Sequence, residues 1–150
     1  MEHPFYDFQI LDNAFRYDFI SVGKTVINKT IIYQKTSIDN LFTLSMGDLL
    51  EDGKLDFETR SNNGDRDTIL ATIIQTLQQF LQQYQEASVG FSGSSPSRTR
   101  TYQILINREW IDISKKFVVK GYDSNGLEEF LSNKNYEGFV ISLKNNTFDT

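Results

Sequence analysis

The spacing of the hydrophobic residues changes after Gly64, and this change limits what the chain can fold into more than any other feature. Before Gly64, apolar and polar residues alternate along several short runs, which is typical of strands with one buried face. From Ile69 to Tyr84, apolar residues recur at steps of three and four, which is typical of one side of an amphipathic helix. Strands grouped ahead of a long helix predict an α+β fold.

The residues ahead of Gly64 predict an antiparallel β-meander. Four runs with alternating or β-branched composition are candidate strands, and Asp52-Gly53 predicts a hairpin turn that leads to a fifth. These candidate strands cover residues 6–10, 15–19, 26–33, 41–46 and 55–58. Because short turns join them, neighbouring runs are expected to pair in chain order.

Two helices are predicted after the meander. The first covers residues 67–86, with Asp65 or Asp67 capping its start and a glutamine-rich side that we interpret as solvated. The second begins with Ser95 as N-cap and Pro96 at its first position, a combination that favours a helix start. Its apolar side would hold Tyr102, Ile106, Trp110 and Ile113.

The remaining segments complete the predicted fold. They predict strands at 87–92, 117–122 and 139–143 and a short helix at 126–131, while 102–106 also fits a strand by its β-branched content. We therefore expect an N-terminal antiparallel β-meander packed against one long amphipathic helix and a second helix, with C-terminal strands completing the sheet. With no linker or internal repeat, the chain is expected to form a single α+β domain over residues 1–150.

The chain contains no cysteine, and His3 is its only histidine. Disulfides, zinc ribbons and thiol nucleophiles are therefore excluded, and Ser/His/Asp catalysis and histidine-based zinc sites are disfavoured. We assign no catalytic residue, no metal ligand and no cofactor from the sequence.

The net charge of the chain is −5, and an acidic surface opposes non-specific binding to nucleic acid and to anionic membranes. Residues 98–120 are an exception, because 6 basic and 2 acidic side chains give this segment a net charge of +4. The first residues lack a basic segment followed by an apolar run, and no stretch approaches about 18 consecutive apolar residues. We therefore predict a cytoplasmic protein without a signal peptide or membrane contact.

Two further patterns are weak indicators of function. Gly23-Lys24-Thr25 resembles the end of a P-loop, but Asp18 stands where the first glycine of that motif belongs and strand-like residues follow, so we reject it. Acidic residues gather around the predicted hairpin, where they would hold Mg²⁺ or Ca²⁺ or, as we favour, form a solvated turn that protects a sheet edge. They are Asp48, Glu51, Asp52, Asp56 and Glu58.

The second helix start is the best candidate for a binding site. A strand that runs through Gly93 into a helix leaves free N–H groups, and the helix dipole attracts anions to them. The candidate ligand-binding residues in this segment are Ser94, Ser95, Ser97, Arg98, Thr99, Arg100 and Tyr102. Arg98 and Tyr102 are one turn apart and share a side of the helix, whereas Arg100 points elsewhere. The alternative is that Ser95 only caps the helix and the arginines are solvated or paired with acids.

The loop before the first helix is likewise a polar, glycine-containing segment that leads into a helix start. Asn63 within it is a further candidate ligand-binding residue. Its polar groups would meet those of the second helix start if both lie at one end of the sheet. Asn, Gly and Asp also suit such a loop for local reasons, because they tolerate positive φ and cap helices.

The block from Gly93 to Tyr102, with Ser-Arg-Thr-Arg at its centre, is part of a wider pattern. The further blocks are Phe42–Asp48, Ser61–Asp65, Ala71-Thr72 and Asn135–Phe139. Together they resemble a family of small bacterial proteins known only as a domain of unknown function. The sequence departs from the family pattern at Thr101, often aliphatic, and at Gly138, often Ala. The resemblance implies a one-domain cytosolic protein and no particular activity.

Three function classes remain open. The first is a non-catalytic binding protein for a phosphate-bearing ligand, a nucleotide or nucleic acid, at Ser94–Arg100. The second is a protein-interaction subunit, antitoxin-like or an adaptor, that meets its partner through the basic segment or the glutamine face. The third is a metal-dependent hydrolase or nuclease that uses the acids from Asp48 to Glu58. The sequence ranks the third last, because the chain lacks a usable histidine, cysteine or acid-x-Lys step on a strand.

Overall fold

The computed structural model describes residues 3–57, 62–93 and 95–144. Within these ranges, nine strands form one sheet in the order β1-β2-β3-β4-β6-β9-β7-β8, and β5 pairs with β4. The strands are β1 (Phe8–Leu11), β2 (Arg16–Val22), β3 (Val26–Lys35), β4 (Leu41–Leu49), β5 (Leu55–Asp56), β6 (Ser88–Phe91), β7 (Phe117–Asp123), β8 (Gly126–Glu129) and β9 (Gly138–Leu143). The helices are α1 (Arg66–Gln83), α2 (Pro96–Arg108) and α3 (Trp110–Lys116), with a 3-10 turn, η1 (Asp12–Ala14), after β1.

The predicted α+β class and the N-terminal antiparallel meander are confirmed, since β1 to β5 pair antiparallel in chain order. The second half of the sheet begins with β6, which lies parallel to β4 and pairs Val89 with Phe42. The last strand, β9, lies between β6 and β7 and is antiparallel to both. The C-terminal strands therefore complete the sheet, as expected.

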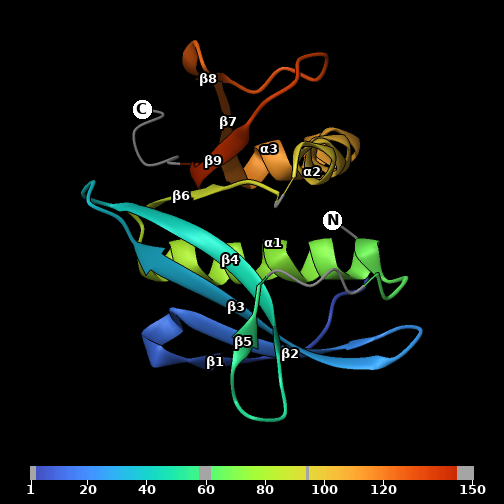
Figure 1. Ribbon diagram of the computed structural model, residues 1–150. Helices are drawn as coiled ribbons and strands as arrows, with labels where there is room; N and C mark the ends of the chain where they lie inside the picture. The colour runs from blue at the N-terminus through green and yellow to red at the C-terminus, as the bar shows by residue number, and fades with distance from the viewer. Residues whose placement is uncertain (1–2, 58–61, 94, 145–150) are drawn as a thin grey trace.

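Helix α1 supplies much of the core, as its apolar period predicts. Leu77, Phe80 and Leu81 are buried, and the Phe80 ring stacks on Tyr33 of β3 with 4.2 Å between centroids. Burying side chains of this size contributes about 1.5–3 kcal/mol each. Figure 1 shows α1 across the middle of the molecule, with β3 and β4 passing in front of it, β1 and β2 below it, and α2, α3, β7 and β8 above it. No helix in the described part of the chain is long and apolar enough to cross a membrane.

Two predicted elements differ in the structure. Residues 126–131 do not form a helix, because Asp123 and Gly126 face each other across a two-residue turn and β8 pairs with β7. The Asp123 carboxylate accepts the backbone N–H of Asn125 (2.8 Å) and supports this turn. The second helix is also divided, since α2 ends at Arg108 and α3 begins at Trp110. Its predicted start is confirmed: Ser95 is the N-cap, with Pro96 after it.

Candidate ligand-binding site

The sheet splits along one edge of β4. Strand β6 pairs with Leu41–Thr43 at one end of this edge, and β5 pairs with Asp48 and Leu49 at the other. Strand β3 pairs with the opposite edge of β4 from Phe42 to Asp48. Residues Leu44–Gly47 lie between the two partners and border a cleft whose other walls come mainly from α1, α2, β6 and β9.

The cleft has two adjoining halves that share part of their lining. The polar half has a volume of about 380 Å³ and contains the starts of both α1 and α2. The apolar half has a volume of about 730 Å³ and extends along β4 toward β6 and β9. Both volumes fall in the range of roughly 300–1,000 Å³ that small-molecule sites occupy. The side chains that border both halves are Met46, Phe57, Leu70, Ile73, Arg98 and Tyr102.

Arg98 and Tyr102 stand at the junction of the two halves. They come from successive turns of α2, and among the residues that the structure describes Arg98 has no carboxylate partner. Burial raises the pKa of the Tyr102 phenol above its usual value of 10.0, and the positive charge of Arg98 opposes that rise. The guanidinium of Arg98 is therefore close enough to Tyr102 to act on it electrostatically.

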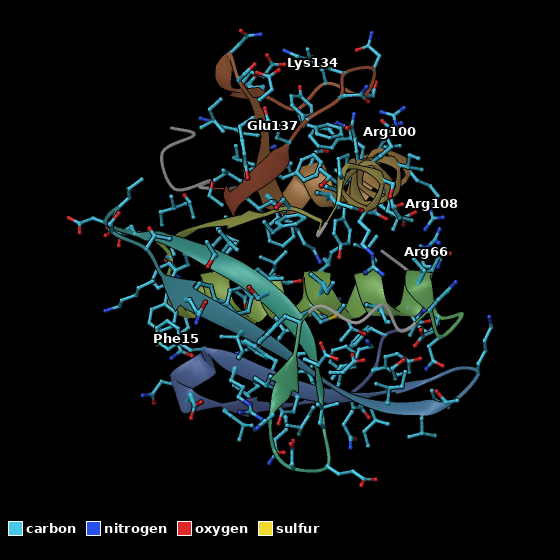
Figure 2. The ribbon with its side chains drawn as sticks, viewed as in Figure 1. Phe15, Arg66, Arg100, Arg108, Lys134 and Glu137 are labelled. Carbon is cyan, nitrogen blue, oxygen red and sulfur yellow. The ribbon has the colours of Figure 1, made fainter. Side chains whose placement is uncertain are left out.

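Arg100 lies outside the cleft. Its Nη1 donates to the Asn135 side-chain oxygen (2.7 Å), and Figure 2 shows it on the side of α2 away from α1. The spacing of Arg98 and Arg100 on an ideal helix predicts this separation. Arg100 therefore joins α2 to the loop after β8 and does not line the site.

The hydroxyl residues of the block divide into two groups. Ser95 and Thr99 build the helix start: the Arg98 N–H donates to Ser95 Oγ (3.3 Å), and buried Thr99 accepts the N–H of Gly93 (3.0 Å). Ser97 borders the polar half of the cleft, as does Thr101, which the sequence did not single out as a ligand-binding residue. Ser94 lies outside the described residues.

Asn63 is buried, and the chain itself uses both ends of its side-chain amide. Its Oδ1 accepts the Thr25 N–H (2.8 Å), and its Nδ2 donates to Ser21 Oγ and to the Thr25 carbonyl (both 2.9 Å). These bonds join the turn between β2 and β3 to the loop before α1. Asn63 borders the cleft, but its side chain has a structural role there.

The carboxylate of Asp65 belongs to the same network. It accepts hydrogen bonds from the Tyr6 hydroxyl (2.6 Å) and the Ser21 hydroxyl (2.5 Å). Asp65 occupies the N-cap position of α1, but its side chain makes no capping bond, so the predicted cap is wrong in that respect. Both hydroxyls donate to Oδ2 and hold the carboxylate toward Tyr6 and Ser21 instead of the first turn of the helix. Asp67 instead forms an ion pair with Arg108 (3.1 Å).

The acids of the predicted hairpin do not all reach the site. Asp48 and Asp56 face each other across β4 and β5 and border the polar half of the cleft. Asp52 accepts the Lys54 N–H (3.0 Å) within the exposed turn, Glu51 is exposed, and Glu58 lies outside the described residues. In the part of the chain that the structure describes, no group of three His, Cys, Asp or Glu side chains is placed to hold a metal ion.

Sequence reasoning missed two basic side chains of the cleft, Lys29 and Arg66. Lys29 is only 5% exposed and donates to Asp48 (2.6 Å), its cross-strand neighbour. The alternation along β3 could have identified Lys29, because it falls on the same side of the strand as Ile31 and Tyr33. A lysine on the buried side of a strand needs an anionic partner. Arg66 begins α1, and Figure 2 shows it at the end of that helix, below Arg108 of α2.

Comparisons with known proteins identify the family of this chain. Residues 2–144 match the model of a family of unknown function, DUF6934, and the chain belongs to that family. No curated protein and no solved structure gave a match. The family carries no assigned activity, so the cleft itself is the basis for a functional proposal.

Proposed function

We propose that this DUF6934 protein is a non-catalytic binding protein for a phosphate-bearing ligand, which Arg98 holds at the junction of the cleft. The observation that carries the proposal is the position of Arg98: it borders both halves of the cleft and has no carboxylate partner among the described residues. A guanidinium presents paired N–H donors that match a phosphate, and such charge-assisted bonds are stronger than neutral ones.

The surroundings of Arg98 support an anionic ligand. Ser97 and Thr101 lie one position before and three after Arg98 on α2 and border the same half of the cleft. The Thr101 hydroxyl donates to the Ser97 carbonyl (3.1 Å), whereas the Ser97 hydroxyl, 3.1 Å from Ser95 Oγ, can donate to a ligand when Ser95 supplies the proton of that bond. Arg66 adds a second positive charge from α1. Partial exclusion of water strengthens these interactions relative to an open surface. In the competing account, Ser95 is only a cap and Arg98 is merely solvated.

The experiment compares Arg98 with its neighbour Arg100. Inorganic phosphate should raise the melting temperature of the parent protein, because a ligand that binds the folded state stabilises it. Arg98→Ala should abolish this rise and leave the unliganded protein within about 1 kcal/mol of the parent. Arg100→Ala is the matched control, since it removes the same charge two positions away and outside the cleft, and it should retain the rise.

Three results would contradict the proposal. In the first, phosphate and nucleotides leave the melting temperature of the parent unchanged. In the second, both arginine variants lose the rise equally, which would show a general effect of charge rather than a site at Arg98. Unfolding of Arg98→Ala without ligand would make Arg98 a structural residue and would equally refute the proposal.

A protein partner is the second candidate function, and a separate surface favours it. Ile20, Val22 and Val26 are 51%, 59% and 70% exposed, and Val22 and Val26 face each other across β2 and β3. Alternation along the strand places Ile20 on the same face. Exposed apolar groups of this kind occur at protein interfaces. Sedimentation of the parent and of Val22→Asp tests this alternative. Self-association of the parent that is lost in the variant would support an interface at these residues. A parent that is monomeric at all concentrations would show that this surface does not bind a second copy of the chain.

A further inference from the structure

We infer that the ligand of the cleft is a phosphate monoester with a ring-bearing body, of the class of nucleoside monophosphates, with its phosphate at Arg98 and its body in the apolar half. This inference rests on the proposed function and adds the chemical class of the ligand. It follows from the shape of the cleft beyond Arg98 and from the balance of charges in the polar half.

The cleft does not end at Arg98. Beyond it, the apolar half is larger than the polar half and is bordered by Leu44, Ile74 and Phe91 among other residues. A free phosphate would leave this space to water against apolar side chains, at a cost of roughly 25 cal/mol for each Å² left exposed. A ligand body attached to the phosphate would cover that surface.

The walls of the apolar half fit a ring better than an alkyl chain. Tyr102 and Phe91 border it, and their rings meet edge to face with 5.9 Å between centroids, so two aromatic side chains stand where a ligand ring would pack. Ser45 also borders it, on the stretch of β4 between its pairings with β6 and β5, so polar backbone groups of a strand edge lie beside the apolar side chains. An aromatic ring with polar edges uses both features, whereas an alkyl chain would leave the polar strand edge unused.

The charges of the polar half limit how much negative charge the ligand can carry. Among the described residues, its basic side chains are Lys29, Arg66 and Arg98, and Asp48, Asp56 and Asp65 oppose them in equal number. Lys29 already lies 2.6 Å from Asp48. A triphosphate would therefore meet fixed carboxylates beyond its first phosphate, and like charges repel strongly where water is partly excluded. One phosphate group suits this balance.

Calorimetric titration with four compounds tests the inference. Adenosine monophosphate should bind the parent at least roughly tenfold more tightly than inorganic phosphate, and more tightly than hexyl phosphate or magnesium-free adenosine triphosphate. Ile74→Gln places an amide in the apolar half, so it should remove most of the advantage of the monophosphate and leave the affinity for inorganic phosphate within about twofold. Gln78→Ala, one turn along α1 and outside the lining, is the control and should change neither affinity.

The outcomes separate this inference from the proposed function. If inorganic phosphate binds in an Arg98-dependent manner but adenosine monophosphate gains nothing, the ring-bearing ligand is refuted and the proposed function stands. If hexyl phosphate or the triphosphate binds more tightly than the monophosphate, the ligand class is wrong. If no phosphate compound binds, the proposed function fails and the inference fails with it.

Discussion

The backbone carbonyl of Asn63 occupies the space that a side chain at Gly23 would need. The same carbonyl accepts the N–H of Lys24 (2.9 Å), so the turn between β2 and β3 lies directly against the loop before α1. This contact explains the Gly23-Lys24-Thr25 segment without a phosphate site. Its glycine permits a close approach of two backbones, and its threonine supplies bonding partners for Asn63.

We predict that Gly23→Ala destabilises the protein by about 1–3 kcal/mol, because the added methyl group collides with backbone that cannot rotate away. Gly90→Ala is the matched control. A methyl group at Gly90 would meet its nearest atoms at 3.8 Å, an ordinary contact, so that variant should stay within roughly 0.5 kcal/mol of the parent. Chemical denaturation of both variants measures the difference, and equal stability would show that the two segments do not touch in solution.

The core position of α1 makes a second prediction. Leu77 is 2% exposed, so Leu77→Ala should lower the free energy of unfolding by about 2–5 kcal/mol through lost burial and the cavity left behind. Gln82→Ala on the exposed side of the same helix should change it by less than about 0.5 kcal/mol. A Leu77→Ala variant as stable as the parent would mean that this side of α1 does not pack on the sheet.

The ionisation of Tyr102 provides a test of the junction without any ligand. Burial raises the pKa of its phenol above 10.0, and Arg98 lowers it by favouring the phenolate. Removing the guanidinium in Arg98→Ala should therefore raise the pKa of Tyr102 further, while Arg100→Ala should leave it unchanged. NMR of protein labelled at the tyrosine Cζ carbon, titrated upward from about pH 9, resolves this group from the other tyrosines. If the pKa of Tyr102 is the same in the parent and in Arg98→Ala, the two side chains do not interact at the junction.

We expect the protein to have no hydrolytic turnover. His3, the only histidine, lies 3.7 Å from Glu109 and does not line the cleft, and the chain has no cysteine to serve as a nucleophile. The assay follows DNA, RNA and nucleotides incubated with purified protein and Mg²⁺ or Mn²⁺. Metal-dependent cleavage that disappears in Asp48→Ala or Asp56→Ala would refute this expectation and assign a catalytic site to the acids of β4 and β5.

Local patterns were enough to predict most elements, and failures occurred where a longer-range contact or a stronger local signal decided the outcome. The helix predicted at 126–131 did not form because Ser124 and Asn125 make a two-residue turn, supported by the Asp123 carboxylate, that leads the chain back into β8. The pairing of β6 with β4 could not be foreseen, because a parallel pair needs a crossover and only the packing of α1 fixes which strand receives it.

The candidate site could be predicted only where its residues lie close together in the sequence. The four-residue spacing of Arg98 and Tyr102 places them on one side of a helix, and the structure brings both to the cleft. Lys29 and Arg66 lie far from that block in sequence, and only the fold brings them close to it. Asn63 and Thr99 illustrate the opposite error, because polar residues in a promising loop were needed for its internal hydrogen bonds.

The central claim is that Arg98 holds a phosphate at the junction of the cleft, and a crystal structure of the parent grown in phosphate tests it most directly. The account predicts a phosphate ion within hydrogen-bonding distance of the Arg98 guanidinium, beside Ser97 or Thr101 and away from Arg100. It would be contradicted by a cleft without phosphate whose Arg98 is paired with a carboxylate, or by phosphate bound only at other surfaces of the molecule.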